Sequence, residues 1–176
     1  MSRPMEYTEL LHHHAAYFRS RRKIFKASMH GLDGALQRKD HNEGISLELF
    51  LCGMYFVFGR RFLARFDNPH AFLRMQQELV PNGKLNSMTR WWRRYRSVPG
   101  GQAVFAKYEE RLTRILWNAI RIAKASSIRT NGLPEIIAAL CLDEEVVRDL
   151  KLRWGFMPRD YLPPRSSFKP PMSPSV

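Results

Sequence analysis

Residue types that catalyse reactions or bind metals are few in this sequence, and their spacing does not bring them together. His12, His13 and His14 are consecutive, so on a helix they would point about 100° apart and could not converge on one metal. Cys52 and Cys141 lie in apolar stretches without a neighbouring base, which favours buried thiols over nucleophiles. No pair of carboxylates with catalytic spacing stands out either. We therefore expect a non-enzymatic protein without a metal site or cofactor.

Positive charge is the chemically distinctive property of the chain. The 176 residues include 29 Lys plus Arg against 16 Asp plus Glu, a formal net charge of +13. This imbalance favours anionic partners, with nucleic acid, anionic lipid and acidic protein segments all open. Hydrophobic residues make up 44% of the chain, which is enough for a packed core and argues against wholesale disorder.

Arginine is concentrated between residues 60 and 96, where nine basic residues stand against two acidic ones. Guanidinium groups can bind carboxylates or phosphates through two parallel hydrogen bonds. A second basic run, residues 19–26, precedes this region and could extend the same surface. The residues that we expect to bind an acidic ligand are Arg60, Arg61, Arg65, Arg90, Arg93 and Arg94.

Two other interpretations of this basic region stay open. The arginines could form a solvated face whose aliphatic stems cover apolar surface, with Trp91 and Trp92 in the core. Alternatively, these tryptophans could stack on nucleic-acid bases, although the stretch TRWWRRYR is too short to be specific.

Apolar residues that repeat every three or four positions predict the helices that must position these side chains. The repeat is strongest between residues 102 and 126 and includes Val104 and Tyr108. Ser46 and Pro134 are suited to helix starts, and the acidic run at Asp143 is favourable at a helix N-terminus. We expect helices over residues 6–29, 46–66, 69–80, 86–96, 102–126, 135–141 and 143–154.

These elements predict an all-α fold, a compact bundle of about six to seven helices. Residues 1–157 are expected to form a single helical domain, with turns at 81–84 and 97–102. Residues 158–176 contain six prolines, which predicts an extended, disordered tail. The longest apolar run, 49–58, is too short to span a membrane, and no secretory signal is visible. We expect a cytoplasmic protein, with peripheral attachment to the inner membrane through partners left open.

Residues 46–156 resemble the cytosolic helical domain of the DotM/TrbA (IcmP) family of type IVB secretion and conjugation systems. The resemblance is carried by SLELFLCGMYFVFGRRFLARF, FLRMQQEL, GKLN, YEERLTRILWNAIRIAK, GLPEIIAAL and DEEVVRDL, in that order. The family's tryptophan-containing motif reads IAALCLDEE here. The resemblance implies a subunit of a coupling complex whose basic surface binds acidic, glutamate-rich export signals. It assigns that role to Arg60, Arg61 and Arg65, and less directly to the later arginines.

A weaker similarity links ISLELFLCGMY and NGLPEIIAALC to the N-terminal repeats of Clp proteins. The leading hypothesis is a non-catalytic helical adaptor of a type IV secretion or conjugative transfer apparatus. Its expected partners are acidic protein or peptide segments and other subunits of that apparatus. A basic nucleic-acid-binding protein and a stand-alone Clp-like protein adaptor are the alternatives.

Overall fold

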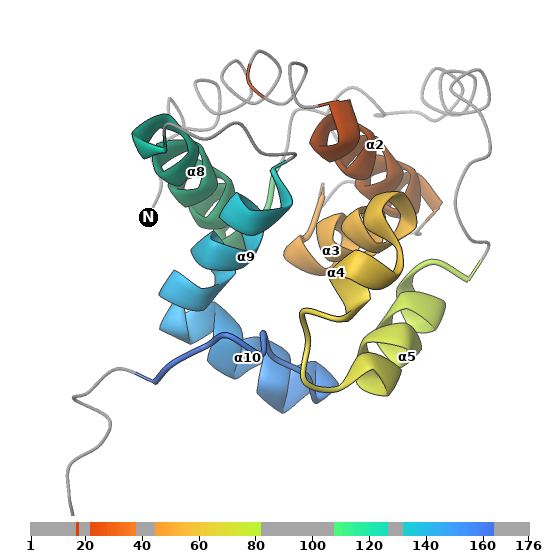
Figure 1. The fold of residues 1–176 in the computed structure, drawn as a ribbon. Coiled ribbons are helices and arrows are strands. Elements are labelled where there is room, and N and C mark those ends of the chain that lie inside the picture. Colours follow the sequence, from red (N-terminus) through yellow and green to blue (C-terminus); the bar gives the residue numbers. More distant parts are fainter. Residues whose placement is uncertain (1–16, 18–21, 38–44, 82–107, 127–131, 164–176) are drawn as a thin grey trace, which may run out of the picture.

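The computed structural model describes residues 17, 22–37, 45–81, 108–126 and 132–163, and within them it confirms the all-α fold. Two groups of helices face each other across the core, one formed by α2 to α5 and the other by α8 to α10 (Figure 1). The helices of the described residues are α2 (Arg22–Gln37), α3 (Leu47–Phe58), α4 (Arg60–Leu63), α5 (Pro69–Leu79), α8 (Glu110–Ala125), α9 (Leu133–Leu142) and α10 (Glu144–Trp154). None of these helices is long and apolar enough to cross a membrane.

A cluster of buried aromatic rings joins the two groups of helices. Phe62 of α4 and Phe72 of α5 lie with their ring centroids 5.7 Å apart, and Phe66 packs against both. Phe156, which follows α10, lies 5.2 Å from the rings of Phe66 and Phe72. All four side chains are fully buried, so the segment after α10 belongs to the same core as α4 and α5.

The predicted helix starts at Ser46, Pro134 and Asp143 are confirmed. The Ser46 hydroxyl accepts a hydrogen bond from the Leu49 N–H at 3.1 Å, and the Asp143 carboxylate accepts one from the Val146 N–H at 3.2 Å. Pro134 lies in the first turn of α9, where its missing N–H costs nothing. These three starts were predictable because capping depends on a few neighbouring residues.

The prediction of one continuous helix over residues 46–66 is wrong. The chain leaves the helical conformation at Gly59, which has φ 60° and ψ −132°, a region that residues with a Cβ rarely adopt. The Gly59 N–H still donates to the Tyr55 carbonyl at 2.7 Å, which completes α3 before the chain turns into α4. The basic pair Arg60 and Arg61 is therefore on a separate helical turn.

For the helix predicted over residues 102–126, residues 102–107 lie outside the described residues, and in the described part α8 begins at Glu110, two residues after Tyr108. Tyr108 is buried as expected, but it forms a β-bridge with Ile45 instead of a helical turn. The Glu109 N–H donates to the Ile45 carbonyl at 3.0 Å, and the Glu109 carboxylate accepts from the Leu47 N–H at 2.9 Å. Pairing with a segment more than 60 residues away thus outweighs the helical repeat at this end.

The first predicted helix, 6–29, also differs from the structure, because α2 continues to Gln37. Gly31 lies against the backbone of α3 at Leu49 and Phe50, so α2 is stabilised by close packing beyond the predicted end. Residues 1–16 and 18–21 of that prediction lie outside the described residues.

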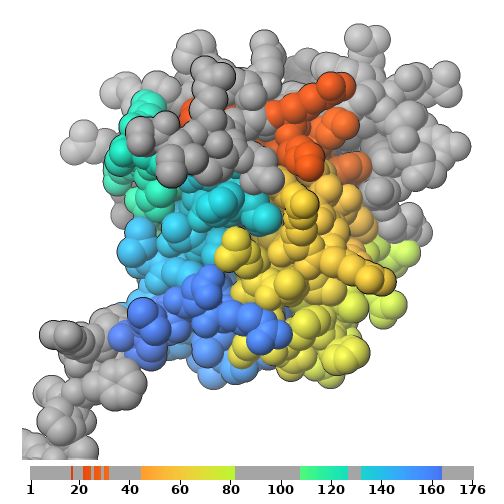
Figure 2. Space-filling model, in the orientation of Figure 1, coloured from red at the N-terminus to blue at the C-terminus, as the bar shows by residue number. Residues whose placement is uncertain are grey.

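The first six residues of the predicted tail lie against the connection between α4 and α5. Pro158 forms an antiparallel bridge with Phe66, and the Arg159 N–H donates to the Arg65 carbonyl at 2.8 Å. In Figure 2 these dark-blue residues fill the space between the yellow α4 region and α9. The rest of the tail, residues 164–176, lies outside the described residues, as do the predicted helix 86–96, the turn at 97–102 and residues 82–84 of the turn predicted at 81–84.

Candidate functional site

The described part of the predicted arginine site is on the turn between α3 and α5. Arg60 and Arg61 belong to α4 and are exposed, while the side chain of Arg65 is 41% exposed. The other three predicted site residues, Arg90, Arg93 and Arg94, lie outside the described residues, together with Trp91 and Trp92.

Helix α2 brings further cations to this turn, because it runs antiparallel to α3 in close contact. Gly53 of α3 packs directly against the backbone of α2. A Cβ at position 53 would lie 2.0 Å from the Ala27 carbonyl oxygen, so only glycine fits there. At the other end of the contact, the Lys23 ammonium lies 5.6 Å from the centroid of the Phe58 ring, within the range of a cation–π interaction. The N-terminal end of α2 therefore lies beside the C-terminal end of α3 and the start of α4.

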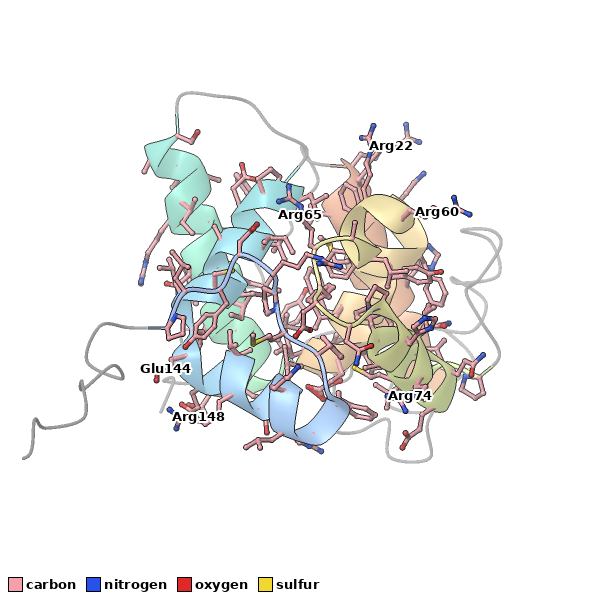
Figure 3. The ribbon with its side chains drawn as sticks, turned by 60° about the horizontal axis from the view of Figure 1, so that its bottom comes forward. Arg22, Arg60, Arg65, Arg74, Glu144 and Arg148 are labelled. Atoms are coloured by element: carbon pink, nitrogen blue, oxygen red, sulfur yellow. The ribbon has the colours of Figure 1, made fainter. Side chains whose placement is uncertain are left out.

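We call the resulting cluster the basic face. Its members are exposed cations of α2 and α4, namely Arg22, Lys23, Lys26, Arg60 and Arg61. Figure 3 shows Arg22 and Arg60 projecting from the two neighbouring elements, on the side of the molecule away from Glu144 and Arg148. The run at residues 19–26, which the sequence suggested as an extension, thus contributes its described part to the same surface.

The five cations of the basic face have no carboxylate partner among the described residues. The position of Arg60 and Arg61 also suits positive charge, because the carbonyl end of a helix carries partial negative charge and α4 directly follows the end of α3. Other exposed cations, such as Arg74 on α5 and Arg121 on α8, lie on separate helices. The basic face is therefore the described surface best able to accept an anionic ligand.

Arg65, by contrast, already has an internal partner. One of its terminal nitrogens lies 3.4 Å from a carboxylate oxygen of Asp160, whose side chain is 66% exposed. Next to this pair, the Arg159 Nε donates to the Ala64 carbonyl at 3.0 Å. The predicted site residue Arg65 is thus partly neutralised by the segment that follows α10.

A second set of arginines lies at the junction of α3, α8 and α10, and sequence reasoning missed its role. Arg111 of α8 donates to the carboxylates of Glu109, Glu48 and Asp149. Arg114, one turn further along, bonds Asp143 at 3.1 Å. No sequence signal pointed to this role, because Arg111 and Arg114 lie outside the buried stripe of α8 and their partners are distant in the chain.

Burial and charge oppose each other in this cluster. Burial raises the pKa of Glu48, and the charge and hydrogen bond of Arg111 offset part of that increase. Burial disfavours the charged form of Arg111, but the hydrogen bond to Glu109 and the charges of Glu48 and Glu109 together raise its pKa. The carboxylates thus favour the charged form of Arg111, and their contacts with it connect α3, α8 and α10.

An open depression of about 430 Å³ adjoins this junction. Its lining contains both positively and negatively charged residues, so the depression does not favour either an anionic or a cationic ligand. The lining residues are Glu109, Arg111, Glu145, Arg148, Asp149, Leu152 and Arg153.

The remaining candidates from the sequence are two cysteines within the described residues and three histidines outside them. Burial raises the pKa of the Cys52 thiol, and burial together with the charge of Asp160 raises that of Cys141. Within the described residues, no three His, Cys, Asp or Glu side chains are grouped so that they could hold a metal ion. His12, His13 and His14 lie outside those residues.

Comparisons of the chain with protein-family models, with curated proteins and with solved structures find no match.

Proposed function

We propose that this chain is a non-catalytic helical binding module that holds an acidic segment of another protein on its basic face. The observation that supports the proposal is the contrast in pairing. Cations of α8 and α10 such as Arg111, Arg114 and Arg148 have carboxylate partners, whereas Arg60 and Arg61 have none in the described chain. A ligand carboxylate would supply the missing counter-charge.

The recognition would depend on several weak contacts. Exposed ion pairs contribute about 0–1 kcal/mol each and are screened over about 8–10 Å at physiological salt. Five cations can therefore give useful affinity only to a ligand that presents several carboxylates at once. This requirement favours a glutamate- or aspartate-rich segment over a single acidic side chain.

The resemblance of residues 46–156 to the DotM/TrbA family would make that partner a substrate or subunit of a type IV secretion or conjugation apparatus. This setting is part of the proposal and has its own test. Affinity purification of the tagged chain from its native cell should recover subunits of such an apparatus. Recovery of an unfoldase of the Clp type instead would favour the alternative adaptor.

Titration with a fluorescent, glutamate-rich peptide tests the binding itself. We expect binding at low salt that weakens strongly between about 0.05 and 0.5 M salt, and no binding of the same peptide with Gln at every Glu position. The double substitution Arg60→Gln/Arg61→Gln should weaken binding by about five- to tenfold, since it removes two exposed pairs.

Arg148→Gln combined with Arg153→Gln is the matched control, because it removes the same charge from α10 and should change affinity by less than about twofold. Circular dichroism would verify that every variant is folded. Absence of peptide binding by the folded wild-type chain would contradict the proposal. Tighter binding of duplex DNA, with a steep dependence on salt, would replace it with nucleic-acid recognition.

A further inference from the structure

The segment after α10 adds a cation to the turn that carries Arg60 and Arg61. Residues 157 and 159 pair with the chain between α4 and α5: the Asp67 N–H donates to the Met157 carbonyl at 3.0 Å, and the Arg159 N–H donates to the Arg65 carbonyl at 2.8 Å. This backbone pairing fixes the position of Arg159 independently of its side chain.

The Arg159 side chain is anchored at one nitrogen and free at the others. Its Nε donates to the Ala64 carbonyl at 3.0 Å, and the Ala64 N–H in turn bonds the Arg60 carbonyl at 2.9 Å. The Arg159 guanidinium therefore lies at the C-terminal end of α4, the single helical turn that begins at Arg60. Its terminal NH₂ groups have no partner among the described residues, and the residue is exposed. An anchored guanidinium loses less side-chain entropy on binding than a freely rotating one.

Asp160, the residue that follows Arg159, reduces the positive charge available to a ligand. Asp160 places its carboxylate 3.4 Å from Arg65, so it occupies a cation that a ligand carboxylate could otherwise use. Both side chains are exposed to solvent at this pair, at 41% for Arg65 and 66% for Asp160, which makes the contact weak enough to exchange.

We propose that Arg159 is part of the site for acidic segments, and that Asp160 competes with the ligand for Arg65. This inference rests on the proposed function and names two residues that the sequence pattern did not suggest. Without the C-terminal segment, the site would lack Arg159, and Arg65 would have no competing carboxylate from Asp160. With it, the site spans two parts of the chain almost 100 positions apart.

Titration of the full chain with the same glutamate-rich peptide at low salt tests the inference. Arg159→Gln should weaken binding by about two- to fivefold, while Asp160→Asn should strengthen it by a similar factor. The double variant Arg65→Gln/Asp160→Asn should return to within about twofold of the wild-type affinity, because the cation that Asp160→Asn releases is then absent.

Arg148→Gln is the matched control for Arg159→Gln, since it removes one exposed charge on α10 at the other end of the molecule. Equal effects of Arg148→Gln and Arg159→Gln would overturn the inference, because they would reflect net charge alone. So would unchanged affinity in Asp160→Asn. If Arg60→Gln/Arg61→Gln weakens binding while Arg159→Gln does not, the inference fails and the proposed function stands. If neither Arg60→Gln/Arg61→Gln nor Arg159→Gln weakens peptide binding, the proposed function fails as well.

Discussion

The junction of α3, α8 and α10 and the basic face of α2 and α4 use the same kind of side chain for different purposes. At the junction, the guanidinium of Arg111 is 17% exposed and touches three carboxylates. On the basic face, Arg60 and Arg61 are exposed and have no carboxylate partner in the described chain. A count of arginines therefore says little about function until the partners are known. The comparison separates stability, which should depend on the junction, from binding, which should depend on the face.

Substitution of Arg111 should cause the largest loss in the free energy of unfolding. Arg111→Met leaves Glu48 and Glu109 without their counter-charge, and removing one partner of a largely buried ion pair costs about 3–5 kcal/mol. Urea unfolding measures this loss. Adding Glu48→Gln should recover part of it, because the orphaned buried charge is then removed. A loss below about 1 kcal/mol would mean that the junction is not the stabilising region.

The second-largest loss of stability is expected from disrupting the contact between α2 and α3. A Cβ at Gly53 would meet the Ala27 carbonyl oxygen at 2.0 Å, so Gly53→Ala forces the two helices apart. Overpacking of this kind costs about 1–3 kcal/mol, measured by thermal or urea unfolding. Since α2 carries three cations of the basic face, peptide affinity should fall as well. Stability close to the wild type would show that the helices are less tightly packed than the structure has them.

A smaller loss of stability is expected from substitution of Asp67, whose carboxylate accepts hydrogen bonds from Lys151 and from the Met157 N–H. Burial would raise its pKa, but the hydrogen bonds from Lys151 and the Met157 N–H outweigh it and lower the pKa below 3.8. A carboxyl whose pKa is lower in the folded state stabilises the fold above its unfolded pKa and loses that contribution as the pH falls through the folded value.

Asp67→Asn should therefore reduce the unfolding free energy by about 1 kcal/mol at pH 7, and the difference from the wild type should shrink as the pH falls below 3.8 and through the lowered pKa of the folded state. Urea titrations between pH 7 and pH 2.5 measure both. A difference that persists at the acid end would assign the effect to the amide side chain instead of the charge.

The smallest effect on stability is expected on the basic face. Arg60→Gln/Arg61→Gln removes two exposed side chains, and surface substitutions of this kind stay within about 0.5 kcal/mol. A slight gain is consistent with reduced repulsion among neighbouring cations. The same variant should show the large loss of peptide binding described above, whereas Arg111→Met at a temperature where it is folded should not. A reversal of these two outcomes would break the comparison between the regions.

Local signals accounted for much of the fold. Ser46, Pro134 and Asp143 start helices as predicted, because each acts on backbone groups within three or four residues. Two of the ends that were wrong depend on distant contacts, since Tyr108 pairs with Ile45 and α2 continues along α3. The third is local: the positive φ of Gly59 interrupts a stretch whose apolar pattern predicted one helix.

The candidate site likewise has a part that the sequence predicted and a part that only the structure revealed. Arg60, Arg61 and the run at residues 19–26 were identifiable from charge clustering alone. The assembly of Arg60 and Arg61 with the described part of that run, Arg22, Lys23 and Lys26, depends on Gly53 and the antiparallel contact of α2 with α3. The pairing of Arg65 with Asp160 could not be anticipated, since 95 residues separate the two in the chain.

The sequence by itself determined the helical class, the helix starts at Ser46, Pro134 and Asp143 and the excess of positive charge, because propensity, capping and net charge are properties of neighbouring residues or of composition. The tertiary structure decided which arginines are tied to carboxylates and which are exposed without one in the described chain. The free energy of a charged side chain depends on its solvation and on the charges within a few ångströms, and those neighbours come from segments that only folding brings together.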